Sequence, residues 1–271
     1  MYEKIKQTTA YIQSKTNFKP EIGIVLGSGL GNLGNQIEVE IAISYGEIPN
    51  FPVSTVKGHK GKLLFGNLGG KKVMAMQGRF HFYEGYSMQE ITFPIRVMKE
   101  MGIELLILSN AAGGMNPDFK VGDIMLINDQ INLFPDNPLM GPNDDRLGVR
   151  FPDMSEVYDK ELIQKAHKIA SAHDIFLHEG VYIGTTGPAF ETPAEYKYFR
   201  IIGGDTVGMS TVPEALVARH AGIPCFAASI ITDLGVEGIV EKVSHEEVLE
   251  AAQSAEPKLT LIITELLKSL S

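Results

Sequence analysis

Cysteine is nearly absent from the 271-residue sequence, which contains only Cys225. A single cysteine excludes an intrachain disulfide and fits a reducing compartment, where thiols stay reduced. Cys225 lies within the apolar run 224–231, a position typical of a buried cysteine that packs like a small hydrophobic residue. We therefore expect this side chain to contribute to packing.

Long apolar runs are also missing, since none approaches the ~20 residues of a membrane-spanning helix. The first 13 residues are charged and follow a helical pattern, without the apolar segment of a secretory signal. We expect a cytoplasmic protein that has no membrane partner.

Basic residues are outnumbered, because 24 lysines and arginines face 33 aspartates and glutamates, which gives a formal net charge of -9 at pH 7. The resulting field repels phosphate polymers and anionic surfaces, so nucleic acid is not an expected partner. A small anion would have to be held by a local cluster of donors.

Linkers, internal repeats and low-complexity segments are lacking as well. Hydrophobic residues make up 44% and charged residues 21% of the chain, as in ordinary globular proteins. Buried strand patterns alternate with capped helix patterns, which predicts an α/β fold, and we expect residues 1–271 to form one domain. The predicted strands lie at 22–26, 38–45, 63–66, 72–76, 105–108, 123–128, 179–183 and 225–231, and the predicted helices at 2–15, 87–101, 159–172 and 192–201, with two more beginning near 211 and 244.

One stretch, GGDTVGMSTVPEALVARH at 203–220, follows the pattern of a short buried strand, a turn and a helix. Thr211 and Glu214 have the spacing of a capping box, and Pro213 falls in the first turn, where no amide donor is needed. Ser210 would then stand at the N-terminus of a helix, where free N–H groups and the helix dipole suit an anion. An ordinary helix cap without a ligand is the alternative.

A second stretch, QGRFHFYEGY at 77–86, places Arg79, His81 and Tyr83 at alternate positions. In an extended segment the three side chains would point the same way. Guanidinium, imidazole and phenol groups together suit a pocket for an oxyanion beside a polyol. A solvent-exposed edge strand is the alternative.

Two further strand patterns end in small or hydrogen-bonding residues. LGSGLG at 26–31 carries Ser28, and in LSNAAGG at 108–114 we expect the strand to end near Asn110. Together with the first two stretches they provide four strand ends, which are what a ligand site at the carboxyl edge of an α/β sheet requires.

A glycine fingerprint offers a different class of function. Gly29, Gly31 and Gly34 spell G-x-G-x-x-G, which occurs in dinucleotide-binding folds. That fingerprint needs a helix followed by a second parallel strand, whereas residues 38–45 follow almost at once and alternate like an antiparallel strand. An NAD-dependent oxidoreductase is therefore the less favoured enzyme class.

The motifs taken together resemble the trimeric, low-molecular-mass class of purine nucleoside phosphorylases, which are pentosyltransferases of purine salvage. The resemblance runs in family order from about Gly23 to the C-terminal helix. It implies a mixed, partly closed β-sheet flanked by helices, and phosphorolysis of inosine and guanosine with phosphate as co-substrate and no cofactor or metal. The motifs are LGSGLG, GH at 58–59, QGRFHFYEGY, SNAAGG, GPNDD, RFPDMSE, GPAFETPAE, VGMSTVPEA and SHEEV.

The same resemblance implies a role for individual residues. The implied phosphate ligands are Ser28, His59, Arg79, His81, the backbone N–H of Ala111, and Ser210. The implied nucleoside contacts are Tyr83 and Met209 at the ribose, His245 at its 5′-hydroxyl, Asn110 near the sugar side of the base, and Phe190, Glu191 and Val207 around the purine. Phe151, on a long proline-rich loop expected at 129–155, would enter the site of a neighbouring subunit in a homotrimer.

Three residues are the expected catalytic groups: His81, Glu191 and Asp233. Glu191 can accept a hydrogen bond from N1–H of hypoxanthine or guanine. Without the resemblance, Glu191 and His245 would be unremarkable residues at helix N-termini.

Asp233, in ITDLG, departs from the family, whose 6-oxopurine members usually have asparagine there. A protonated Asp233 could donate to N7 of the base, whereas an ionised Asp233 could accept from the 6-amino group of adenine. The sequence therefore leaves two hypotheses open: a protonated stand-in for asparagine, or a specificity broadened to adenosine.

Overall fold

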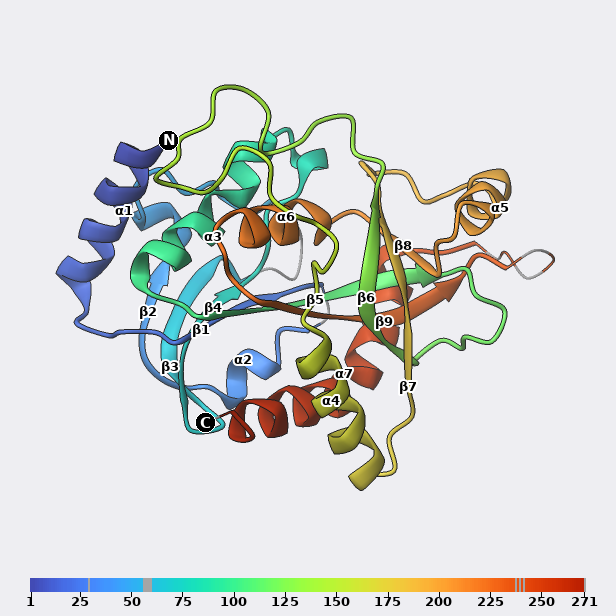
Figure 1. The fold of residues 1–271 in the computed structure, drawn as a ribbon. Coiled ribbons are helices and arrows are strands. Elements are labelled where there is room, and N and C mark those ends of the chain that lie inside the picture. Colours follow the sequence, from blue (N-terminus) through green and yellow to red (C-terminus); the bar gives the residue numbers. More distant parts are fainter. Residues whose placement is uncertain (29, 56–59, 237, 239, 241, 271) are drawn as a thin grey trace.

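A mixed β-sheet organises the protein in the computed structural model, which describes residues 1–28, 30–55, 60–236, 238, 240 and 242–270 (Figure 1). The strands of this sheet are β1 (Ile22–Leu26), β2 (Glu38–Ser44), β3 (Lys62–Leu68), β4 (Lys71–Gln77), β5 (Leu105–Gly114), β6 (Ile124–Asn132), β7 (Leu177–Gly184), β8 (Thr206–Gly208) and β9 (Cys225–Leu234). Their spatial order is β2-β3-β4-β1-β5-β8-β7-β6-β9, and β5 also pairs with β9. The pairing of β5 with β9 closes five strands into a barrel, while the other four extend from β5 as an open sheet, which confirms the predicted partial closure.

The strand β1 is central to the open part. All five of its residues are buried, and it pairs in parallel with β4 on one side and β5 on the other. An apolar run of this kind belongs in a parallel sheet covered on both faces. The predicted hairpin is β3 and β4, which pair antiparallel.

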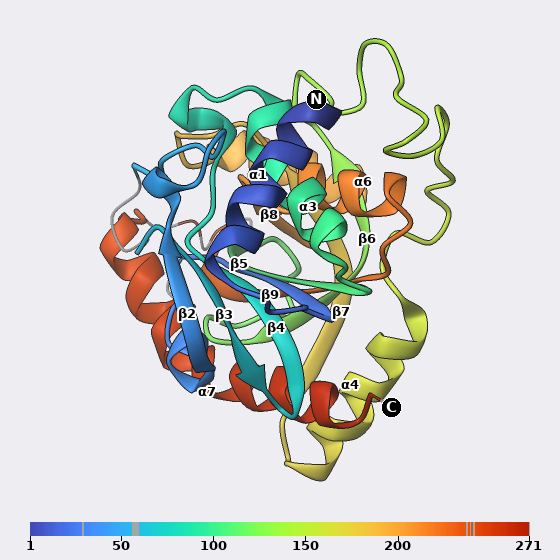
Figure 2. The same cartoon turned by 90° about the vertical axis from the view of Figure 1, so that its left-hand side faces the viewer.

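Helices cover both faces of the sheet. In Figures 1 and 2, α1, α3 and α6 lie against one face, and α2, α4 and α7 lie against the other. Within the described part of the chain, no helix is long and apolar enough to cross a membrane. The helix bounds are α1 (Tyr2–Lys15), α2 (Leu33–Gln36), α3 (Met88–Met101), α4 (Lys160–Ala172), α5 (Pro193–Ile201), α6 (Val212–His220) and α7 (His245–Lys268), with short 3₁₀ turns η1 (Tyr45–Glu47) and η2 (Phe82–Glu84).

Several strands run past their predicted ends, and β5, β6 and β9 do so by three residues or more. The strand β5 does not end near Asn110 but continues through the small residues to Gly114, because β8 and β9 supply partners for its last residues. The strand β6 runs to Asn132, so the long loop begins at residue 133 and not at 129. The strand β9 extends to Leu234 and includes Asp233.

The predicted extended segment after β4 is only partly correct. The strand ends at Gln77, Gly78 turns the chain with φ of 121°, and Tyr83 lies in the 3₁₀ turn η2. Arg79, His81 and Tyr83 therefore do not share one face of a strand. They converge through the turn.

The glycine fingerprint does not lead into a dinucleotide-binding unit. The helix that contains its last glycine, α2, has four residues, and the next strand, β2, pairs antiparallel with β3. Gly29 lies outside the described residues. The segment thus lacks the long helix and second parallel strand that the oxidoreductase alternative requires.

Candidate functional site

A cavity of about 450 Å³ opens beside the barrel and the ends of the open sheet. It is lined by most of the residues that the sequence predicted for the site. These are Ser28, Arg79, His81, Tyr83, Asn110, Ala111, Phe190, Glu191, Val207, Met209, Ser210, Asp233 and His245. The prediction for His59 lies outside the described residues.

Phe151 does not line the cavity of its own chain. Its side chain is 86% exposed on the long loop, and it lies near the guanidinium of Arg150, 5.7 Å from the ring centroid. A large exposed aromatic ring is compatible with the predicted contact to another subunit, which stays a prediction.

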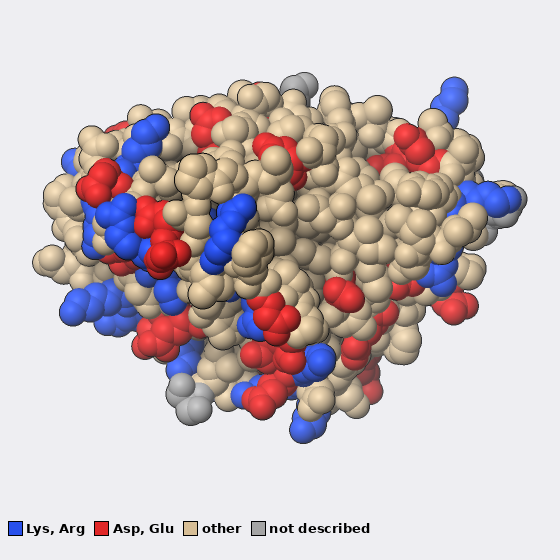
Figure 3. Space-filling view, turned by 45° about the horizontal axis from the view of Figure 1, so that its top comes forward, with Lys and Arg blue, Asp and Glu red and all other residues tan. Residues whose placement is uncertain are grey.

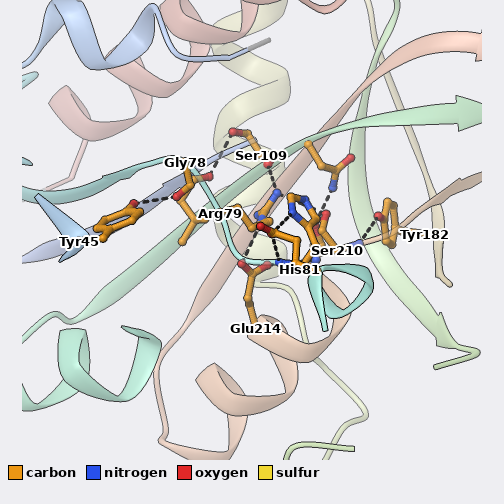
Figure 4. Close-up of polar contacts among 12 residues, drawn as sticks. Tyr45, Gly78, Arg79, His81, Ser109, Tyr182, Ser210 and Glu214 are labelled. Atoms are coloured by element: carbon orange, nitrogen blue, oxygen red, sulfur yellow. Dashed lines mark hydrogen bonds and ion pairs between the residues drawn. The ribbon is translucent and has the colours of Figure 1, made fainter. Parts of the chain in front are cut away.

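The charge that could hold an anion lies inside the protein. On the face shown in Figure 3, acidic and basic side chains are interspersed around a broad uncharged area. Arg79, by contrast, is only 1% exposed. Its Nε donates to Glu214 Oε1 at 2.8 Å, and its Nη1 donates to the Ser109 carbonyl at 2.8 Å and to Ser210 Oγ at 3.3 Å (Figure 4). These contacts fix a guanidinium at the wall of the cavity.

Glu214 connects Arg79 to the helix α6. One carboxylate oxygen takes the Arg79 bond, and the other accepts from the backbone N–H of Thr211 at 3.0 Å. The sequence predicted Glu214 only as a capping residue. Its ion pair with a residue 135 positions earlier was missed, because a capping pattern says nothing about long-range contacts.

The turn before α6 is strained. Thr211 has φ of 67° and ψ of −53°, and Val212 N–H donates to the Ser210 carbonyl at 2.7 Å, which forms a γ-turn. Asn110 Nδ2 holds the Thr211 hydroxyl at 2.8 Å. Strained residues of this kind persist where the surroundings determine them and often mark functional sites. The turn presents Ser210 one residue before the helix cap, at the positive end of the α6 dipole.

His81 is oriented by Glu84. Glu84 Oε1 accepts from the backbone N–H of His81 at 2.8 Å and from its ring Nδ1–H at 3.1 Å, while Oε2 accepts from the backbone and hydroxyl of Thr55, both at 2.7 Å. Burial lowers the pKa of His81, so the neutral ring keeps its proton on Nδ1. The ring also stacks on Tyr83, with centroids 4.7 Å apart. Sequence reasoning assigned no role to Glu84, although it stands within the motif.

The opposite end of the cavity holds two acids, Glu191 and Asp233. Burial raises the pKa of both, and the negative charge of Asp233 raises that of Glu191 further. Tyr196 Oη donates to Asp233 Oδ2 at 2.9 Å, and Thr232 Oγ1 donates to Asp233 Oδ1 at 3.0 Å. Tyr196 was not predicted as a site residue. The sequence showed it only as a residue of the helix that begins after Thr192, with nothing to indicate a contact with Asp233.

The cavity wall also carries polar atoms that suit a polyol. Asn110 Oδ1 and His245 Nε2 are buried and have no hydrogen-bond partner among the described residues. Buried polar groups in native proteins are normally satisfied, so such atoms at a cavity wall point to a polar ligand. Within the same described residues, no cluster of three or more His, Cys, Asp or Glu is placed to hold a metal ion.

Comparisons with known proteins match the chain over nearly its whole length. A family model described as the phosphorylase superfamily matches residues 21–268. Purine nucleoside phosphorylase 1 of Geobacillus stearothermophilus is 49% identical over 267 residues, covering 98% of this chain and 97% of that protein. The crystal structure of Schistosoma mansoni purine nucleoside phosphorylase in complex with adenosine has a TM-score of 0.94 at 43% identity, covering 99% of this chain and 98% of that one. A Schistosoma purine nucleoside phosphorylase in complex with guanosine has a TM-score of 0.93 at 42% identity, covering 99% and 97%.

Proposed function

This chain belongs to the phosphorylase superfamily, and on that premise we propose that it is a purine nucleoside phosphorylase. The reaction is the reversible phosphorolysis of purine (deoxy)ribonucleosides to the free base and (deoxy)ribose 1-phosphate. One observation supports this assignment above the others. A single cavity is lined by a buried arginine at a helix N-terminus, by the acids Glu191 and Asp233, and by two residues with unsatisfied polar atoms.

The phosphate end is assigned to the arginine side of the cavity. Arg79 supplies the charge, and the N-terminus of α6 adds a favourable dipole. A phosphate here lies beside the ribose, where Asn110 and His245 have unsatisfied atoms. The proposed phosphate ligands are Ser28, His59, Arg79, His81, Ala111 and Ser210, and the proposed ribose contacts are Tyr83, Asn110, Met209 and His245.

The purine lies at the end that holds Glu191 and Asp233, between Phe190 and Val207. In the reaction the C1′–N9 bond breaks as a phosphate oxygen bonds to C1′. The electron pair of the broken bond moves into the purine ring, whose N7 then takes a proton. The ribosyl centre becomes cation-like, so the bound phosphate anion stabilises it, while donors to the purine stabilise the departing negative charge.

Asp233 allows two specificities within this proposal. Protonated, it donates to N7 of a 6-oxopurine, which matches the raised pKa that burial gives it. Ionised, it accepts from the 6-amino group of adenosine, which matches the two hydroxyls that donate to it here.

Three further features belong to the proposal. The exchange of purine for phosphate at one carbon changes no oxidation state, so the reaction uses no cofactor beyond its co-substrate. The assembly is a homotrimer in which Phe151 completes a neighbouring site. The protein acts in the cytoplasm, which its single buried cysteine suits.

The test is the release of hypoxanthine from inosine with and without phosphate. A phosphorylase releases base only when phosphate is present and forms ribose 1-phosphate in equal amount. Phosphate-independent release would indicate a hydrolase, and binding without turnover would indicate a nucleoside-binding protein. Reduction of NAD in the presence of alcohols would instead support the oxidoreductase.

A further inference from the structure

Tyr196 lies behind the cavity wall, next to the two acids at the base end. The side chain comes from α5 and is 4% exposed. Its ring lies against Gly235, where an added Cβ would overlap the ring carbons, and its hydroxyl lies beside Gly113, where an added Cβ would come within 3.1 Å of Oη. Two glycines thus make the space that lets this phenol reach the acids.

The Tyr196 hydroxyl interacts with both acids of the base pocket. It donates to Asp233 Oδ2 at 2.9 Å, and it also hydrogen-bonds to the Glu191 side chain. A phenol has one proton to donate. Because the Tyr196 proton goes to Asp233, that carboxylate receives one donated hydrogen bond at Oδ2. The Thr232 hydroxyl is shared between the Ala112 carbonyl at 3.3 Å and Asp233 Oδ1 at the shorter 3.0 Å, so the contacts around Asp233 favour its ionised form.

The two classes of purine require opposite placements of one proton. A 6-oxopurine needs an ionised Glu191 to accept from N1–H and a protonated Asp233 to donate to N7. Adenine needs a protonated Glu191 to donate to N1 and an ionised Asp233 to accept from the 6-amino group. Both placements carry the same charge, so the residue that favours one acid over the other sets the base preference.

We propose that Tyr196 is a specificity-determining positioning residue, which holds Asp233 as an acceptor and so opens the pocket to 6-aminopurine nucleosides. This inference rests on the proposed phosphorolysis. Tyr196 lies behind the described residues that line the cavity and reaches it through the two acids, so we expect its effect to be confined to the choice of base.

The groups that act on Asp233 come from four parts of the described chain. Tyr196 reaches it from α5, Glu191 from the loop before α5, and the neutral hydroxyl of Thr232 from β9. His245, at the start of α7, lines the same cavity. Burial raises the pKa of Asp233, and the hydrogen bonds from Tyr196 and Thr232 lower it by less. The Tyr196 contact lowers the pKa of Glu191 as well, but the 2.9 Å bond of its hydroxyl is to Asp233. Loss of the phenol hydroxyl therefore raises the pKa of Asp233 further.

The experiment compares kcat/KM for adenosine and inosine in the wild-type protein and in Tyr196→Phe. We expect wild type to cleave both, and the variant to lower the adenosine-to-inosine ratio by about tenfold, which corresponds to one pKa unit. Inosine turnover, which needs protonated Asp233, should also persist to higher pH in the variant. Tyr198→Phe is the matched control, because Tyr198 is on the same helix and 53% exposed, and it should change neither quantity.

Two outcomes of this comparison would overturn the inference: a wild-type protein that cleaves inosine but not adenosine, or a Tyr196→Phe variant with the wild-type ratio and pH profile. In an Asp233→Asn background the effect of Tyr196→Phe must disappear, because an amide does not titrate, and persistence would show a merely structural role. Should the phenylalanine variant not fold, Thr232→Val removes the other donor and must shift the ratio the same way. Failure of wild type to cleave inosine with phosphate would sink the proposed function instead.

Discussion

Arg79 is held so tightly by its neighbours that its replacement affects binding and stability together. Its ion pair with Glu214 is almost fully buried, with side-chain exposures of 2% and 6%. Removal of one partner of such a pair leaves the other charge buried and uncompensated. The residue that we propose to supply charge to the phosphate is thus also part of the buried core.

Arg79→Met should reduce phosphate-dependent base release by roughly 100-fold or more, because a charge-assisted hydrogen-bond donor to the oxyanion is lost. It should also lower the free energy of unfolding by about 3 kcal/mol, since Glu214 keeps a buried charge without a partner. Initial rates over a phosphate titration and urea unfolding measure the two effects. Arg79→Lys, which keeps the positive charge, should lose less of each, and equal losses in both variants would count against this role.

Glu84 makes the stability of the fold depend on pH. Burial opposes its ionisation, but hydrogen bonds from His81 and Thr55 outweigh burial and lower the pKa of Glu84 to about 2 from its ordinary 4.5. A carboxylate with a lower pKa in the folded state stabilises the fold above the unfolded pKa, and this contribution is lost as the pH falls toward the folded pKa.

Glu84→Gln should therefore be less stable than wild type at pH 7, with a difference that shrinks as the pH falls from about 4.5 toward about 2. Urea unfolding of both proteins at pH 7 and at pH 3 measures this difference. A difference that stays constant between the two values would contradict the assigned hydrogen bonds. Glu47→Gln, at an exposed site, is a control for removal of a carboxylate.

The sequence could predict residues that line the cavity but not the residues that hold them in place. Arg79, His81 and Ser210 stood out through their chemistry and spacing, and Glu191 and His245 through the family resemblance. Glu214, Glu84 and Tyr196 hydrogen-bond to Arg79, His81 and Asp233. Their roles depend on contacts that only the folded chain creates. Tyr196 reaches Asp233 across 37 positions of sequence, which no local pattern encodes.

At the scale of elements, the helices were easier to predict than the ends of the strands. Ser87, Thr192 and Ser244 accept hydrogen bonds from the third residue of α3, α5 and α7, as their capping patterns predicted. Strand ends depend on a partner: the last residues of β5 are alanines and glycines of low strand propensity, yet they pair with β9. Local sequence cannot show that pairing.

The packing of α5 on β9 depends on Gly235, against which the Tyr196 ring lies. Gly235→Ala should lower the free energy of unfolding by about 1–3 kcal/mol, because the added methyl overpacks this contact. It should also displace Tyr196 and lower the adenosine-to-inosine ratio. Gly46→Ala is the matched control, since an added Cβ there meets nothing within 4 Å. Equal stability of the two variants in urea would contradict this packing.

At the scale of the whole molecule, barrel closure assembles the site from distant segments. The strand β9 carries Asp233 next to β5, which carries Asn110, and β8 leads into the turn that presents Ser210. Of the predicted site residues that the structure describes, Phe151 alone stands apart, exposed on its loop. A trimer would bring this ring to a neighbouring cavity.

The trimer can be tested by complementation between subunits. Phe151→Ala and Arg79→Met should each have low activity alone. For Phe151→Ala we expect kcat/KM for inosine to fall by about tenfold, because the ring closes a neighbouring site. Trimers reassembled from a mixture should regain activity, because Arg79→Met subunits supply Phe151 to intact pockets. Sedimentation showing only a particle near the 29.6 kDa mass of one chain, or mixtures without recovery, would refute the shared site.

The most direct measurement is base release from inosine, guanosine and adenosine, side by side, with and without phosphate, across pH. We expect that release requires phosphate for each nucleoside, that inosine and guanosine turnover falls as Asp233 ionises, and that adenosine turnover is retained as it does so. Release without phosphate, or no release from any of the three, would contradict the proposed phosphorolysis.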